Sequence, residues 1–189
     1  MIPNWLLTNW SRAGLVMAVM LLALAPLIFW RTGVVFTLVF LQLPVYMIHQ
    51  YEEHSHGQFK KYLADSMGGG REILTGLDIF WINIGMVWAL DLAVLYAANF
   101  YGWKLGMIAV YLSTFNAVTH IVVAVRNREY NPGLWTSLVL FLPVGVASLY
   151  AITAQTDATL PDHATMLAAA IAGHVGIIGL ALYRRRTVS

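Results

Sequence analysis

The chain has 189 residues, of which 59% are hydrophobic and 11% are Asp, Glu, Lys or Arg. Soluble domains carry about 25% charged residues, and one soluble core of this size cannot hide so much apolar surface. The composition therefore predicts a polytopic membrane protein. The absence of cysteine excludes disulfides and thiolate metal sites. The small net charge of +2 gives no indication of a nucleic-acid-binding surface.

Six apolar runs, each close to the ~20 residues that span a bilayer, predict six transmembrane helices. Short polar breaks separate the runs, and the longest break lies at residues 57–78. We identify no convincing internal repeat and no second domain, so residues 1–189 are expected to form a single all-α membrane bundle. The predicted helices are roughly residues 13–30, 32–56, 79–100, 105–125, 134–154 and 164–183.

The basic residues predict how this bundle is oriented. With six crossings, only Arg31 and Lys104 fall on one side of the membrane, and all other basic residues fall on the opposite side. Lys and Arg are concentrated in cytoplasmic loops, so both termini are expected in the cytoplasm, with the protein in an inner or plasma membrane. The residues on the expected cytoplasmic side are Arg12, Lys60, Lys61, Arg71, Arg126, Arg128, Arg184, Arg185 and Arg186.

The second predicted helix ends in a group of ionisable side chains. The spacings of His49, Glu52, Glu53 and His56 place all four on one helical face. His54 is excluded from this set because it lies roughly 100° around the helix from Glu53. Imidazole and carboxylate on one face are typical of metal ligands in a helical bundle, and ionisable groups at this depth usually line a cavity. The alternative is a solvated helix end that faces the cytosol.

Polar residues occur at a similar predicted depth in two later helices. Asn116 and His120 share one face of the fourth helix near its cytoplasmic end, and Glu129 and Tyr130 lie in the turn that follows. His174 lies ~15 Å from the basic end of the sixth helix by helical rise. These separated pieces of sequence are therefore expected to reach one layer of the membrane.

Three short motifs stand in a fixed order in the chain. They comprise His49, Glu52 and Glu53, then Asn116 and His120, and finally Tyr130, Pro132 and Gly133. The first matches the His-X-X-Glu-Glu signature of the HXXEE family of membrane proteins, and the other two resemble that family's later motifs over roughly residues 35–149. The resemblance implies an integral membrane protein and supports this choice of site residues, but it implies no particular reaction.

These residues support more than one chemistry. His and carboxylate side chains together resemble the ligand sets of di-iron or di-manganese bundles, whereas His49, His120 and His174 would resemble a zinc site that activates water. A metal-free alternative is acid–base isomerisation or cyclisation of a lipid. A further alternative is a non-enzymatic lipid-binding protein or a proton-coupled transporter, which would require the intramembrane Asp91.

The sequence favours a membrane-embedded, metal-dependent enzyme, either a hydrolase or an oxidoreductase, with a site on the cytoplasmic side. The expected cofactor is a divalent zinc, iron or manganese ion, and no nucleotide cofactor is indicated. The expected partners are the lipid bilayer and a lipid or other amphipathic substrate, and no nucleic acid. The catalytic candidates are His49, Glu52, Glu53, Asn116, His120 and Tyr130, and the candidate metal ligands are His49, Glu52, Glu53, His56, His120 and Glu129.

Overall fold

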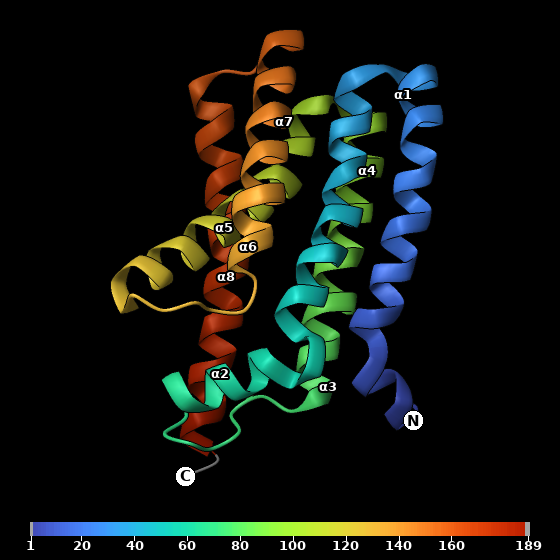
Figure 1. Cartoon of the computed structure of the whole chain (residues 1–189). Coiled ribbons are helices and arrows are strands. Elements are labelled where there is room, and N and C mark those ends of the chain that lie inside the picture. Colours follow the sequence, from blue (N-terminus) through green and yellow to red (C-terminus); the bar gives the residue numbers. More distant parts are fainter. Residues whose placement is uncertain (1, 188–189) are drawn as a thin grey trace.

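The computed structural model describes residues 2–187, which form a bundle of long helices and contain no β-strand (Figure 1). Several helices join end to end through short 3₁₀ or π segments, labelled η. The elements in chain order are α1 (Asn4–His54), η1 (Ser55–Gly57), α2 (Gln58–Ser66), α3 (Gly76–Phe80), η2 (Trp81–Trp88), α4 (Ala89–Tyr101), η3 (Trp103–Gly106), α5 (Met107–Asn127), α6 (Leu134–Thr136), η4 (Ser137–Phe141), α7 (Leu142–Gln155) and α8 (Leu160–Thr187).

The long element α1 is a helical hairpin. The chain reverses at Gly33, where φ is 81° and ψ is −175°, a backbone conformation that is essentially restricted to glycine. Figure 1 shows the two arms side by side with opposite directions, and the rings of Trp10 and His54, one from each arm, have centroids 4.9 Å apart. We call residues 4–32 the first arm of α1 and residues 34–54 its second arm.

The number of separate helices differs from the six predicted. Five helices are long and apolar enough to cross a membrane, and the first of them runs from Asn4 to Ser66. The count is lower than six because the predicted helices 13–30 and 32–56 are the two arms of one continuous element, whose turn is made at a single glycine. The four later spans lie close to their predicted places.

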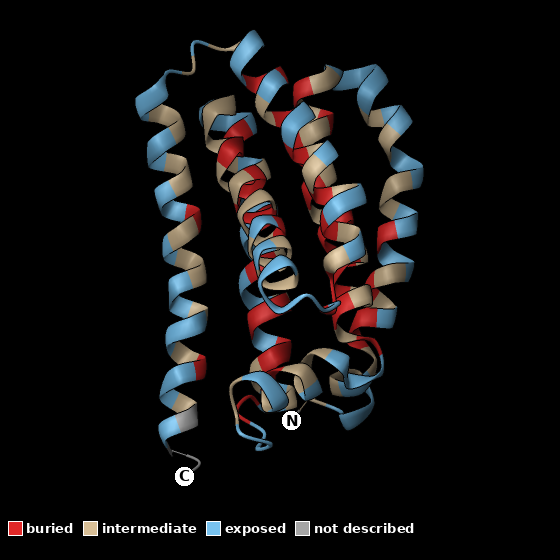
Figure 2. Cartoon of the chain, turned by 60° about the vertical axis from the view of Figure 1, so that its left-hand side comes forward, coloured by how far each residue is buried: buried red, intermediate tan, exposed pale blue. Residues whose placement is uncertain are grey.

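The outer surface of the bundle is largely apolar. In Figure 2 the buried residues face the interior, while the outward faces of the helices are exposed. Large apolar side chains such as Met20 and Leu27 in the first arm and Val175 in α8 are at least 60% exposed. Extended apolar surface on helices of this length is typical of an integral membrane protein. Both ends of the chain lie at the same end of the bundle (Figure 1).

Two buried apolar clusters border the polar end of the second arm. The middle cluster contains Val45, Tyr46, Val87, Leu112, Ala117, Phe141 and Ala170. The terminal cluster, close to the chain ends, contains Trp10, Leu63, Ile73, Leu74, Ile79, Phe80, Ile82 and Ala181. The polar residues of the second arm are therefore bordered by apolar side chains from the first arm and from all the later spans.

Buried hydrogen bonds fix the second arm against its neighbours. Gln42 Nε2 donates to Ser148 Oγ of α7 at 3.0 Å, and Ser113 Oγ of α5 donates to Gln42 Oε1 at 2.8 Å. Farther along the arm, Gln50 Nε2 donates to Asn83 Oδ1 of η2 at 2.8 Å. Interhelical bonds of this kind contribute roughly 0.6–2 kcal/mol each within a bilayer. They set the height at which the ionisable end of the second arm meets the other helices.

Candidate metal centre

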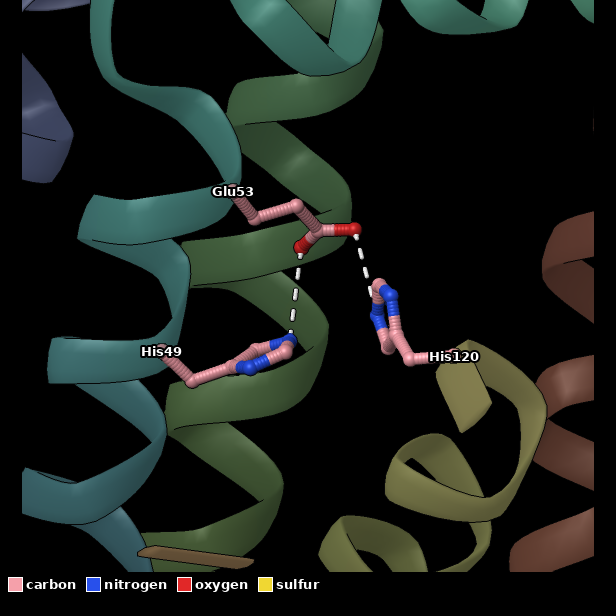
Figure 3. A group of neighbouring side chains, drawn as sticks. All are labelled: His49, Glu53 and His120. Carbon is pink, nitrogen blue, oxygen red and sulfur yellow. Dashed lines mark ion pairs between the residues drawn. The ribbon is translucent and has the colours of Figure 1, made fainter. Parts of the chain in front are cut away.

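Three side chains from two helices converge at the end of the second arm. His49 and Glu53 belong to α1 and His120 belongs to α5, and Figure 3 shows the three directed toward one another. Glu53 Oε2 lies 3.8 Å from His49 Nε2, and Glu53 Oε1 lies 3.8 Å from His120 Nε2. One ligand atom from each residue lies within 4.8 Å of the others, so the group could hold a metal ion. We call these three residues the His–Glu cluster.

Hydrogen bonds to Thr136 determine which nitrogen of His49 carries the proton. The Thr136 hydroxyl donates to Glu52 Oε2 at 2.5 Å, and a carboxylate can only accept. The same hydroxyl lies 2.9 Å from His49 Nδ1. Because its single proton is already used, it must accept from His49 Nδ1–H. In the neutral imidazole Nε2 then has the lone pair, and this atom faces Glu53.

The tautomer of His120 is determined in a similar way by Asn131. The Asn131 amide nitrogen donates to the backbone carbonyl of His120 at 2.9 Å, which directs its Oδ1 toward the ring. Oδ1 lies 2.6 Å from His120 Nδ1 and can only accept, so Nδ1 carries the proton. The Nε2 lone pair of His120 therefore faces Glu53 as well.

The cluster thus brings two imidazole lone pairs to the two oxygens of one carboxylate. A hydrogen bond between these atoms would be shorter, near 2.9 Å. Ligand atoms 2.0–2.2 Å from a tetrahedral zinc ion lie roughly 3.3–3.6 Å from one another. The two observed separations of 3.8 Å, each to a different oxygen of Glu53, are slightly longer than this. Metal-binding histidines usually donate their other ring N–H to a protein acceptor, as both histidines do in this site.

Glu52, the first carboxylate of the pair, has a different set of partners. Its oxygens accept from the backbone N–H of Trp135 at 3.1 Å, from the backbone N–H of Thr136 at 2.7 Å, and from the Tyr130 hydroxyl at 2.9 Å. With the Thr136 hydroxyl, these donors satisfy the four lone-pair positions of the carboxylate. Glu52 therefore stabilises the first turn of the helix that starts at Leu134, where the backbone N–H groups lack helical partners.

The turn before that helix packs directly on the two imidazoles. Gly133 has φ of +97°, and a Cβ built on it would lie 2.7 Å from His49 Cε1 and 2.8 Å from His120 Cε1. Only glycine gives both this conformation and this close approach.

Burial, together with Glu52, raises the pKa of Tyr130 to about 12, so its hydroxyl remains a donor at neutral pH.

His54 contacts the cluster although the sequence analysis excluded it. Its Nε2 lies 3.2 Å from Glu53 Oε2, and its ring packs between Trp10 and Phe59 with centroid distances of 4.9 and 4.8 Å. The prediction that His54 points elsewhere was wrong. The flexible Glu53 side chain and the last turn of the helix bring the two groups together even though their Cα–Cβ directions diverge.

The other predicted site residues lie at varying distances from the cluster. His56 is exposed and lies beyond the end of α1, with φ of 58°, so the predicted four-residue face ends before it. Glu129 is exposed in the turn after α5. Asn116 does border the cluster, because its amide nitrogen lies 3.2 Å from His49 Nε2 and donates to the Tyr46 hydroxyl at 3.1 Å.

A cavity of about 240 Å³ adjoins the cluster. Glu53, His54, His120 and Asn116 contribute to its wall, and so does His174 of α8. Most of the remaining wall is apolar, and several of its residues also pack in or against the terminal cluster. We call this space the cluster cavity.

Asp91 in α4 is buried apart from these residues. Neither of its carboxylate oxygens has a hydrogen-bond partner among residues 2–187. Asp91 is not one of the residues that line the cluster cavity. The sequence analysis placed this residue in a membrane helix but could not identify its surroundings.

Comparison with known proteins gives one match. A family profile described as "Protein of unknown function with HXXEE motif" matches residues 40–148, more than half of the chain. The chain belongs to the HXXEE family. No curated protein and no solved structure matches it. The matched region includes the whole His–Glu cluster and the turn at Gly133, whereas the first arm of α1 and His174 lie outside it.

In this chain the two carboxylates of the HXXEE motif have different partners. The His and the second Glu form the cluster together with His120, while the first Glu binds the helix that supplies Thr136. Sequence reasoning missed Thr136 and Asn131 as orienting residues. Asn131 lies inside the recognised Tyr-X-Pro-Gly motif, but nothing in the sequence pairs Thr136 with His49, because 87 positions separate them.

Proposed function

We propose that this HXXEE protein is a membrane-embedded enzyme whose His–Glu cluster binds one divalent metal ion. The observation that carries the proposal is the convergence of two unprotonated Nε2 atoms on the Glu53 carboxylate. A cation placed between these electron-rich groups would be strongly stabilised in a low-dielectric interior. The residues that fix the two tautomers correspond to the supporting partners found around metal-binding histidines.

The donor set favours zinc among the candidate ions. Two His and one Glu form a ligand set of catalytic zinc sites, in which a fourth position holds water or substrate. Zinc supplies a hydroxide ion at neutral pH by lowering the pKa of its bound water to about 7. Hydrolysis is therefore the reaction class that we favour, and iron or manganese with oxidation chemistry is the alternative within the same site.

The cluster cavity supports an amphipathic substrate. Polar atoms of the cluster form one part of its wall and aliphatic side chains form most of the rest. A molecule with a polar end and an apolar tail matches such a surface. By the distribution of Lys and Arg, the site faces the cytoplasmic side of the membrane.

A metal-free acid–base enzyme is the second candidate, and His54 is the observation that favours it. His54 Nε2 lies 3.2 Å from Glu53 Oε2, within reach of a direct hydrogen bond. A carboxylate in contact with several imidazoles can transfer protons to and from a bound lipid without a metal ion.

Elemental analysis of the detergent-purified protein distinguishes the two candidates. We expect about one equivalent of zinc in the wild type and loss of most of it in His49→Ala, His120→Ala and Glu53→Gln. His163→Ala is the matched control, because His163 bonds Tyr111 and Thr153 and lines no part of the cluster cavity. Equal metal content in all four variants, or a folded wild type without metal, would reject the metal centre.

A further inference from the structure

The wall of the cluster cavity combines ionisable and apolar side chains. Glu53 and His120 of the cluster form one part of it. Another part consists of residues that belong to the terminal cluster or pack against it, namely Ile79, Ile82 and Ile177. A ligand in this space would therefore have its polar end at the His–Glu cluster and its apolar part among these isoleucines.

Among the residues that the structure describes, no Lys or Arg side chain lines the cavity. Protein sites for carboxylate and phosphate groups rely on these cations, especially on bidentate arginine. Glu53 is the acidic residue of the wall, so an anionic head group would meet no cationic side chain there. The volume of about 240 Å³ is also below the range of roughly 300–1,000 Å³ for drug-sized ligands. An anionic head group would therefore depend on the metal ion of the cluster alone for its counter-charge, and the volume limits the ligand to a slender molecule.

His174 supplies a hydrogen-bond acceptor on the cavity wall. Its Nδ1 lies 2.9 Å from the backbone carbonyl of Ala170, which can only accept, so Nδ1 carries the proton. Its Nε2 has the lone pair in the neutral ring and makes no hydrogen bond to any described residue. The ring is held edge-on against Phe115, with centroids 4.9 Å apart. An unused acceptor in a fixed ring suits a ligand that donates a hydrogen bond.

We propose that the cluster cavity binds a single-chain lipid alcohol, whose hydroxyl group donates to His174 Nε2 and whose chain lies along Ile79, Ile82 and Ile177. The inference rests on the proposed function in taking this cavity as the substrate site of the His–Glu cluster. It adds the chemical class of the ligand and assigns its recognition to a residue of α8 that lies outside the HXXEE motifs.

The test compares three ligands that share one chain: 1-decanol, decanoate and decyl phosphate. The full-length protein is purified in detergent, and the thermal midpoint is measured against ligand concentration, since a ligand that binds the folded state raises the midpoint. We expect 1-decanol to bind most tightly. In His174→Leu its Kd should increase about tenfold, as for the loss of one hydrogen bond. His174→Gln retains an acceptor and should bind within a few-fold of the wild type.

A second variant, which narrows the cavity, keeps the proposal testable if the His174 variants do not fold. Ile178 lines the cavity and is half exposed, so Ile178→Trp should fold and should abolish the effect of 1-decanol. Tighter binding of decanoate or decyl phosphate than of 1-decanol would overturn the inference. Wild-type binding of 1-decanol by His174→Leu or by Ile178→Trp would do the same.

Metal content measured on the same samples separates the two proposals. If the wild type contains no metal but binds 1-decanol through His174, the metal centre is wrong and the lipid-alcohol site stands. If zinc is present and lost with His49 while 1-decanol shows no preference, the metal centre stands and the ligand assignment is wrong.

Discussion

At the scale of single residues, the site depends on side chains that hold the cluster without belonging to it. Thr136 and Asn131 fix the two imidazole tautomers, and Gly133 lies against both rings. All three come from one short stretch, residues 131–136. The Tyr-X-Pro-Gly motif and the positions after it therefore serve as the support on which His49 and His120 rest.

Gly133→Ala tests this support. The added Cβ would strain a residue with φ of +97° and would meet carbon atoms of both imidazoles at less than 3 Å. We expect the free energy of unfolding to fall by roughly 1–3 kcal/mol. The amount of bound metal per protein should fall by more than the loss of folded protein alone would cause, because the two imidazole rings are displaced. Thermal unfolding and elemental analysis of the same preparation measure both effects.

Ile178→Ala offers a comparison, because it changes the cavity wall without touching the imidazoles. It should retain its metal. If Gly133→Ala binds metal as the wild type does, the glycine is not required for the position of the rings.

At the scale of elements, the hairpin of α1 rests on the backbone of Gly33. No atom lies within 4 Å of a Cβ built at this position, so the requirement for glycine comes from the backbone conformation alone. The turn brings Trp10 of the first arm beside His54, a residue of the cavity wall. A local conformation therefore affects the site from a distance of sixteen residues along the chain, counted from Gly33 to His49.

Gly33→Ala should lower the free energy of unfolding by about 1–3 kcal/mol through backbone strain. Gly176→Ala is the matched control, since Gly176 is exposed within α8 and a Cβ there also meets nothing within 4 Å. As alanine favours helix over glycine, this control should gain up to about 1 kcal/mol. Denaturant unfolding in detergent measures both variants, and equal stabilities would show that the turn tolerates a side chain.

At the scale of the whole molecule, the hairpin gives an even number of helical arms, so both chain ends lie at one end of the bundle (Figure 1). The end of the second arm, α2 and the C-terminal part of α8 lie toward this same end (Figure 1). The distribution of basic residues predicts that this end faces the cytoplasm.

The absence of cysteine makes this orientation testable by single-cysteine labelling. Ser66→Cys reports on the end with the cluster, and Gln155→Cys reports on the opposite end; both positions are exposed. In intact cells, a membrane-impermeant maleimide should label Gln155→Cys, and Ser66→Cys only after lysis. The reverse pattern would mean that the site opens to the outside.

The sequence predicted the helical class and most span positions, because helical periodicity and hydropathy act locally. It also named all three residues of the His–Glu cluster, His49, Glu53 and His120, as candidate metal ligands. Sequence reasoning did not identify Gly33 as the single residue at which the chain reverses. It also missed the partners of Glu52, because they come from a helix more than eighty positions away. Periodicity also could not show that His54 bends back to Glu53.

The different partners of Glu52 and Glu53 have a consequence for how α1 can vary. The two carboxylates are consecutive, and each must meet a different helix. A slip of the second arm by one residue would move Glu53 toward the start of α6 and remove the carboxylate from the two imidazoles. The spacing from His49 to Glu53 therefore locks the register of three helices at once. Insertions or deletions between these residues should be far less tolerated than a substitution of Tyr51, which lies between them.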